Sequence, residues 1–302
     1  MKVLLTGAAG QLGQALQAAV PVGIELKACS RAELDLADPQ ACHRAVREFR
    51  PDWVLNAGAY TAVDQAEGEP ALAEAVNAGA PQAFAESLQA SGGRLLQLST
   101  DFVFNGRQGH PYQPQQPVDP LGVYGATKAA GEQRAAEALA PERLCILRTS
   151  WVYGPVGRNF LLTMLRLHAR KAEAGEQLGV VADQVGCPTA TPGLAAACWA
   201  VLEHGVHGRH HWSDAGVASW YDFAVAIGEL GVSAGLLQRA AVVQPITTAD
   251  YPTPAQRPRY SLLDCTSTRQ ALALEPRHWR AALVQVLRQL RAEDGGHPAL
   301  SP

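Results

Sequence analysis

The sequence KVLLTGAAGQLG, residues 2–13, places a short apolar run directly before a glycine-rich turn and an Ala/Leu-rich helical segment. Such a run is typical of a strand buried in a parallel sheet. Glycines let the backbone approach a pyrophosphate, and the following helix N-terminus offers unpaired N–H groups with partial positive charge. The spacing is GxxGxxG, not GxGxxG, so the strand-turn-helix context carries the prediction. It predicts a dinucleotide site that includes Gly7, Gly10, Gln11 and Leu12; a purely structural tight turn is the alternative.

The residues after the second expected strand, residues 24–28, bear on which dinucleotide binds. Sites that bind NAD usually place an acid at the end of this strand for the ribose 2′-hydroxyl. Here the strand is followed by Cys-Ser-Arg, and Ser30 and Arg31 are suited to a 2′-phosphate through charge-assisted hydrogen bonds. This favours NADPH, with NADH and an ordinary surface arginine as the alternatives. Two residues expected near the adenine follow: Asp35 and Leu36.

Strand and helix patterns alternate along the first half of the chain. The expected elements are helices over residues 39–50, 70–90 and 122–138, and strands over residues 52–55, 94–98 and 144–148. This alternation predicts an α/β fold, a Rossmann-type doubly wound parallel sheet with helices on both faces. We expect a dinucleotide-binding domain over residues 1–150, whose sheet is extended by later segments, and a mainly substrate-binding, smaller C-terminal domain over residues 151–302.

Ligands of such sheets collect at the carboxyl ends of the strands. Small residues end the third expected strand and leave room for a cofactor: Ala57, Gly58 and Ala59. The fourth strand delivers Thr100 to the same edge. Tyr124 and Lys128 lie four residues apart, so a helix places them on one face. A tyrosine loses its proton near pH ~10, and a neighbouring ammonium lowers that pKa. The pair is a candidate proton donor or acceptor.

Composition excludes several classes of protein. The chain has 302 residues, of which 47% are hydrophobic and 18% charged, so it can bury a large core. The net charge of −3, without a basic block, gives no support to nucleic-acid binding. Nowhere do about 18 apolar residues follow one another, which argues against a membrane span. The six cysteines form no CxxC pair and are typical of a reducing compartment. We expect a soluble cytoplasmic protein.

Together these motifs resemble the extended short-chain dehydrogenase/reductase superfamily: Thr6-Gly7-x-x-Gly10-x-x-Gly13, Thr100, and Tyr124-x-x-x-Lys128. More narrowly, the chain resembles the dTDP-4-dehydrorhamnose reductase family over roughly residues 1–290. The segments that carry this resemblance are NAGAYTAVDQAE (56–67), STDFVFNG (99–106), VYGATKAAGE (123–132), RTSWVYG (148–154), DQVGCPT (183–189) and YPTPAQRP (251–258).

The resemblance implies NAD(P)H-dependent reduction of the 4-keto group of dTDP-6-deoxy-L-lyxo-4-hexulose to dTDP-L-rhamnose. Tyr124 would protonate the carbonyl oxygen, Lys128 would bind the nicotinamide ribose and lower the tyrosine pKa, and Thr100 would hydrogen-bond the same oxygen. By the same resemblance, a further set of residues contacts the sugar or the nucleotide: Thr61, Val63, Asp101, Trp151, Asn159 and Arg257.

One residue separates this chain from the similar sugar-nucleotide 4,6-dehydratases. Those enzymes carry Thr-Asp-Glu, whereas here Phe102 follows Asp101 and cannot act as an acid or base. A 4-epimerase, a reductase of a different keto sugar and a non-catalytic NADP-binding regulatory subunit remain as alternatives. Some family members bind Mg²⁺ through acids, but the matching positions here are Ala15 and Pro192. We therefore expect no metal, and a monomer or a weak homodimer.

Overall fold

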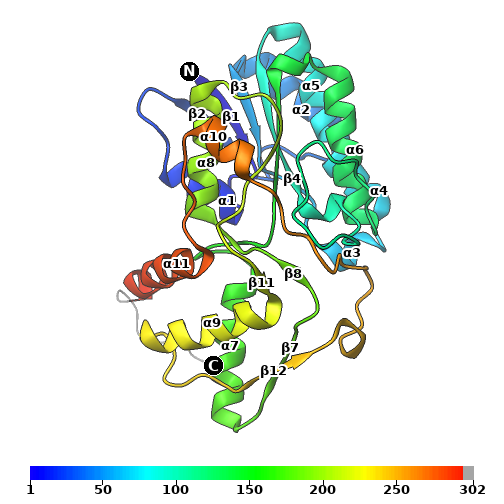
Figure 1. Ribbon diagram of the computed structural model, residues 1–302. Coiled ribbons are helices and arrows are strands. Elements are labelled where there is room, and N and C mark those ends of the chain that lie inside the picture. The colour runs from blue at the N-terminus through cyan, green and yellow to red at the C-terminus, as the bar shows by residue number, and fades with distance from the viewer. Residues whose placement is uncertain (295–302) are drawn as a thin grey trace.

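Six parallel strands form the central sheet of the larger lobe (Figure 1). The computed structural model describes residues 1–294. The strands lie in the order β10-β5-β4-β3-β1-β2, and every neighbouring pair is parallel. They are β1 (Lys2–Thr6), β2 (Glu25–Cys29), β3 (Trp53–Asn56), β4 (Arg94–Thr100), β5 (Leu144–Thr149) and β10 (Gly208–His211). This topology confirms the predicted Rossmann-type α/β fold.

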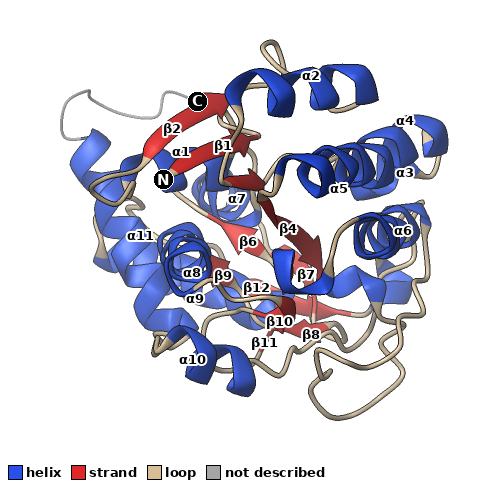
Figure 2. Ribbon diagram, turned by 90° about the horizontal axis from the view of Figure 1, so that it is seen from above, coloured by secondary structure: helices blue, strands red, loops and turns tan. Residues whose placement is uncertain are grey.

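Helices cover both faces of this sheet, as Figure 2 shows from above. Because side chains alternate along a strand, Val3 and Leu5 face one side of β1 and Leu4 the other. Val3 and Leu5 pack in one core with Leu16 of a helix, whereas Leu4 packs with Phe84 of another. The large-lobe helices are α1 (Gln11–Ala18), α2 (Pro39–Phe49), α3 (Val63–Ala66), α4 (Pro70–Glu74), α5 (Ala80–Ser91), α6 (Val123–Ala138), α8 (Thr191–His204) and α10 (Thr266–Leu272).

The segment expected as one helix over residues 70–90 has a different course. A π-helical turn, Ala75–Gly79, separates α4 from α5. Within this turn Asn77 is buried, and its side chain bonds the backbone of Tyr60 in both directions and the hydroxyl of Thr127. The wide turn therefore connects the loop after β3 to α6.

The smaller lobe lies below the carboxyl ends of the strands in Figure 1. Its helices are α7 (Phe160–Ala174), α9 (Trp220–Ser233) and α11 (Trp279–Asp294). Its short strands pair as β6 (Val152–Tyr153) with β9 (Thr189–Ala190), β7 (Leu178–Val181) with β12 (Val243–Ile246), and β8 (Val185–Gly186) with β11 (Ala218–Ser219). Tyr153, Phe223 and Trp279 form the centre of its apolar core.

Three 3-10 turns complete the described structure: Asp101–Val103, Pro141–Arg143 and Thr248–Asp250. All six cysteines are buried, with free thiols. Within residues 1–294, no helix combines the length and apolar character needed to cross a bilayer.

Candidate active site

The carboxyl end of β4 supplies the first part of the site. Thr100 ends this strand and caps the 3-10 turn that follows, because its hydroxyl accepts a hydrogen bond from Phe102 N (3.2 Å). The same hydroxyl donates to Asp101 Oδ1 (3.1 Å). Thr100 and Asp101 are both buried. They lie where β4 ends and the 3-10 turn begins, so their side chains are fixed at the carboxyl edge of the sheet.

Helix α6 supplies the second part. Lys128 is buried, and its ammonium donates to the Leu98 carbonyl of β4 (2.7 Å). The ring of Tyr124 packs edge-on against Phe102, with ring centroids 5.5 Å apart and planes at 71°. The structure therefore brings Thr100, Tyr124 and Lys128 together at the end of β4, as the sequence predicts.

The protonation of this trio differs from the expected one. Burial raises the pKa of Tyr124 to about 12; a hydrogen bond with Thr100 opposes this shift and the Asp101 charge adds to it. The expected net lowering of the Tyr124 pKa is therefore wrong for this structure, because burial outweighs the groups that lower it. Burial lowers the pKa of Lys128 to about 8, opposed by the charge of Glu132. At neutral pH Tyr124 therefore keeps its proton, as a general acid requires.

Asp101 presents an unsatisfied oxygen to the same region. Among residues 1–294, its buried Oδ2 has no hydrogen-bond partner. Burial raises the pKa of this carboxyl to about 6, opposed by hydrogen bonds with Ser261 and Thr100. A buried acceptor without a donor is costly, so this oxygen suits a hydroxyl group of a ligand.

A buried ion pair that the sequence analysis missed lies one turn behind Lys128. Arg148 of β5 binds Glu132 of α6 through two hydrogen bonds, Nε to Oε1 (2.8 Å) and Nη2 to Oε2 (2.6 Å). Ser99, which directly precedes Thr100 in the chain, donates to Glu132 Oε1 (2.5 Å). The pair thus fixes α6 against β4 and β5. The helical spacing Tyr124, Lys128, Glu132 is the signal that places Glu132 on the same helix face as Tyr124 and Lys128.

The glycine turn after β1 forms a cradle with the end of β3. Gly7 has φ +68°, and a Cβ there would lie 2.7 Å from the Cα of Gly58. A Cβ on Gly13 would lie 2.1 Å from the Gly7 carbonyl oxygen, and one on Gly58 would lie 2.6 Å from Leu36. Gly10 caps α1 without a side-chain hydrogen bond, which leaves backbone N–H groups for an anion. The cradle therefore fits a dinucleotide pyrophosphate.

The residues after β2 lie beside this cradle. The backbone N–H of Ser30 donates to Glu33 Oε2 (2.8 Å), and Asp35 Oδ1 accepts from Ala37 N (3.0 Å). Arg31 is exposed, as is Asp35. A guanidinium in water at this position is available to a 2′-phosphate.

Trp151 has an unusual backbone. Its φ of +48° lies in the left-handed region, which is uncommon for any residue with a Cβ. Its indole stacks on Trp220 at 3.6 Å with planes at 6°, and a Cβ on Gly186 would lie 2.8 Å from it. Stacking on Trp220 holds this conformation two residues after the end of β5, and the absence of a side chain at Gly186 leaves room for the indole.

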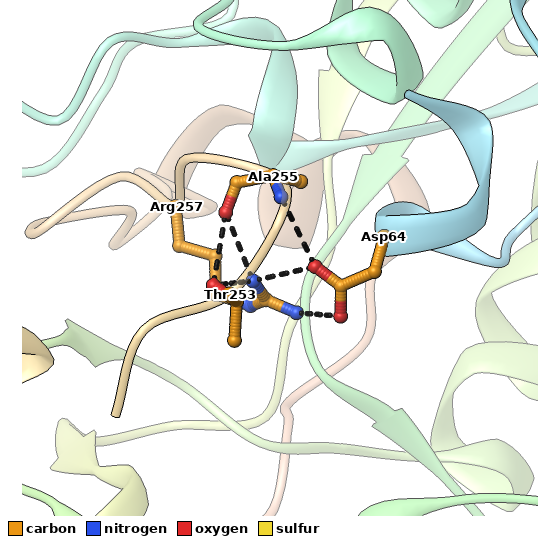
Figure 3. Close-up of polar contacts among 4 residues, drawn as sticks. All are labelled: Asp64, Thr253, Ala255 and Arg257. Atoms are coloured by element: carbon orange, nitrogen blue, oxygen red, sulfur yellow. Dashed lines mark hydrogen bonds and ion pairs between the residues drawn. The ribbon is translucent and has the colours of Figure 1, made fainter. Parts of the chain in front are cut away.

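The other expected substrate residues are less uniformly placed. Thr61 is exposed and Val63 half-buried, at the start of α3. Asn159 caps α7 by accepting from Leu162 N (3.0 Å), and it donates to Gln11 Oε1 (3.2 Å) beside the glycine turn. Arg257 is paired with Asp64, as Figure 3 shows. The expected contacts of Asn159 and Arg257 with a nucleotide stay predictions.

The described residues contain no cluster of three or more His, Cys, Asp or Glu side chains that could hold a metal ion. Ala15 lies on α1 and Pro192 near the start of α8, and these two helices pack against each other.

Comparisons with known proteins identify relatives over nearly the whole chain. The family model described as RmlD substrate binding domain matches residues 1–292. A dTDP-4-dehydrorhamnose reductase from Aggregatibacter actinomycetemcomitans is 40% identical over 293 residues, which are 94% of this chain and 98% of the relative. A probable dTDP-4,6-dihydroxy-2-methyloxan-3-one 4-ketoreductase from Streptomyces antibioticus is 40% identical over 301 residues, 99% of this chain and 98% of the relative.

A similar solved structure is that of dTDP-4-dehydrorhamnose reductase from Bacillus anthracis in complex with NADP. It has a TM-score of 0.87 and 33% sequence identity, and the match covers 95% of this chain and 99% of that chain. The similarity thus extends over both lobes.

Proposed function

This chain belongs to the dTDP-4-dehydrorhamnose reductase family, within the extended short-chain dehydrogenase/reductases, and we propose that it reduces the 4-keto group of dTDP-6-deoxy-L-lyxo-4-hexulose to give dTDP-L-rhamnose. The observation that carries the proposal is the meeting of Thr100, Tyr124 and Lys128 at the carboxyl end of β4, next to the glycine cradle. Full-length similarity to several reductases of this substrate supports the choice of sugar.

The cofactor in this proposal is NADPH, which supplies hydride when bound. Gly7, Gly10 and the N-terminus of α1 would hold its pyrophosphate, and Leu36 and Gly58, which lie against each other beside the glycine turn, would contact the cofactor. Tyr124, neutral at physiological pH, donates its proton to the carbonyl oxygen as that oxygen becomes an alkoxide. The Thr100 hydroxyl donates a hydrogen bond to the same oxygen and opposes the growing charge.

Lys128 has two tasks in this site. Its ammonium, which donates to the Leu98 carbonyl, would also bind the ribose hydroxyls of the cofactor, and its charge would stabilise the tyrosinate left after proton transfer. Asp101 offers its unpaired Oδ2 to a sugar hydroxyl, and the stacked Trp151 forms an apolar wall of the sugar pocket.

Turnover of the keto sugar tests the whole proposal. Purified protein given NADPH and the 4-keto sugar nucleotide should oxidise one NADPH per sugar reduced, and NMR of the product should show dTDP-L-rhamnose. A 4-epimerase would instead invert C4 of a 4-hydroxy sugar nucleotide without net oxidation of NADPH, and absence of turnover of the keto sugar with the trio intact would reject the reductase.

A reductase of a different keto sugar is the second candidate. It is favoured by the 40% identity to the Streptomyces antibioticus protein described as a probable 4-ketoreductase of another dTDP sugar. Competition between the two keto sugars, read as the ratio of their kcat/KM values, decides between the candidates.

Arg31→Ala should reduce the preference for NADPH over NADH. The exposed Arg31 guanidinium is the first cation after the end of β2, and a charge-assisted bond to a 2′-phosphate contributes roughly 1.5–3 kcal/mol. We therefore expect kcat/KM for NADPH to fall by about one to two orders of magnitude, with little change for NADH. The matched control is Arg47→Ala, which removes another exposed arginine, on α2. An unchanged NADPH/NADH ratio in Arg31→Ala contradicts the assignment.

A further inference from the structure

Arg257 and Asp64 form a bidentate ion pair between segments that are 193 residues apart in sequence (Figure 3). Nη1 of Arg257 donates to Oδ1 of Asp64 (3.0 Å) and Nη2 to Oδ2 (2.7 Å). The backbone N–H of Ala255 also donates to Asp64 Oδ1 (3.2 Å). Nη1 of Arg257 donates in addition to Thr253 Oγ1 (2.5 Å) and to the Ala255 carbonyl (3.0 Å). The carboxylate thus closes a proline-rich loop around the guanidinium.

The loop continues into a stretch that touches both lobes, and we call residues 251–263 the crossing segment. In the smaller lobe, the backbone N–H of Val185 donates to the Arg259 carbonyl, and the carbonyl of Val185 accepts from Ser261 N (both 2.8 Å). In the larger lobe, Tyr112 N donates to the Leu262 carbonyl (2.8 Å). The ion pair with Asp64 is therefore one of the attachments that hold the crossing segment to the larger lobe.

The partner of Arg257 sits beside expected substrate residues. Asp64 is the second residue of α3, directly after Val63 and three positions after Thr61. Figure 1 shows the segment that leads from β12 to α10 passing beside α3. A change in how the crossing segment sits on α3 would therefore shift Thr61 and Val63, which are expected to contact the sugar.

The ion pair with Asp64 also limits which ligands Arg257 can bind. A guanidinium uses the same forked edge for a carboxylate as for a phosphate, and here Asp64 occupies that edge. The hydrogen bond with Arg257 lowers the pKa of Asp64, so the pair is ionised at neutral pH. Isolated exposed pairs contribute little, but this pair is bidentate, half-buried and joined to three hydrogen bonds of the loop.

We propose that Asp64 and Arg257 are positioning residues that clasp the crossing segment onto α3 and so shape the nucleotide-sugar site. This inference rests on the proposed function, because the site that is shaped is the one assigned there. It replaces a direct bond between Arg257 and the diphosphate by an indirect action through α3.

Asp64→Asn separates the two roles of Arg257 by the sign of its effect. If the pair is a clasp, the KM for the sugar nucleotide should rise roughly tenfold, more than any fall in kcat or any change in the KM for NADPH. If Arg257 instead binds the diphosphate directly, removing its competitor frees it and the KM falls. A lowered or unchanged KM overturns the clasp. The matched control is Glu229→Gln, which changes an exposed pair with Arg280 (2.9 Å) and should leave the KM unchanged.

Amide hydrogen exchange gives a readout that does not depend on turnover. In Asp64→Asn without substrate, residues 251–258 should exchange faster than in the wild type, whereas Glu229→Gln should match the wild type. Unchanged exchange in Asp64→Asn overturns the clasp. A wild-type protein that does not reduce the keto sugar would reject the proposed function alone, and the exchange experiment would still decide the clasp.

Discussion

Tyr124→Phe should lower kcat by about two to four orders of magnitude, because it removes the proton that the carbonyl oxygen needs. Burial raises the pKa of Tyr124 to about 12, so in the wild type nearly every molecule carries this proton at neutral pH. The substituted ring keeps its edge-on contact with Phe102, at 5.5 Å, so the fold and the shape of the pocket should persist. The KM for the sugar nucleotide should therefore change much less than kcat. Oxidation of NADPH under saturating substrate measures the effect.

Tyr221→Phe is the matched control, since it removes the same hydroxyl from a half-buried side chain of α9. It should keep wild-type kcat. Circular dichroism of both variants checks that the fold is intact. Near wild-type kcat in a folded Tyr124→Phe would mean that another group donates the proton.

The nucleotide-binding half was predictable because its inner strands, β1, β3, β4 and β5, are short buried runs, each followed by a turn or a loop. Residues 2–6 and 94–98 read this way, and their carboxyl ends carry Gly7 and Thr100. Parallel strands bring their carboxyl ends to one edge, so the meeting of these residues follows from chain order alone. Tyr124 and Lys128 were predictable for a similarly local reason, the period of the helix.

The direction of the Tyr124 pKa shift was not predictable from spacing. Spacing places a lysine nearby, but it reports neither the burial of the phenol nor the acceptor that the ammonium chooses. In the structure that acceptor is the Leu98 carbonyl, and burial outweighs the nearby charges. A pKa is a balance of desolvation and contacts, and both are set by tertiary packing.

Contacts between distant segments were likewise not predictable from the sequence. Asp64 and Arg257 belong to unrelated patterns in the sequence, and neither shows a local sign of its partner. The π-helical turn at Ala75–Gly79 is set by Asn77, whose partners lie before it and on α6. In both cases tertiary hydrogen bonds decide what local propensity leaves open.

Glu132→Gln should lower the free energy of unfolding by about 3–5 kcal/mol, because it leaves the charge of Arg148 buried without a counter-charge. Arg148 is 1% exposed, and its other polar contacts are neutral: the Pro114 carbonyl (3.1 Å) and His211 Nε2 (3.3 Å). Burial lowers the pKa of His211 to about 3, and the charge of Arg148 adds to this shift. The His211 ring is therefore neutral and supplies no counter-charge to Arg148. Thermal and urea unfolding measure the loss.

Glu74→Gln, at the end of α4, provides the matched control at an exposed ion pair with the same helix, α6. Glu74 pairs with Arg134 of α6, and both side chains are about 40% exposed, so the expected loss is roughly 0–1 kcal/mol. A Glu132→Gln variant no less stable than Glu74→Gln would show that the Arg148 charge is satisfied by its neutral partners.

A double replacement, Glu132→Leu with Arg148→Met, separates the stability of the pair from its effect on Lys128. Apolar residues of similar volume should recover most of the lost stability, although Ser99 then loses its acceptor. The charge of Glu132 nevertheless raises the pKa of Lys128 against the effect of burial. Loss of the Lys128 ammonium should lower kcat as the pH rises past the pKa of Lys128. Without the charge of Glu132 that pKa falls below about 8, so kcat should begin to decline at a lower pH. A double variant with an unchanged pH profile would show that Glu132 acts on the fold only.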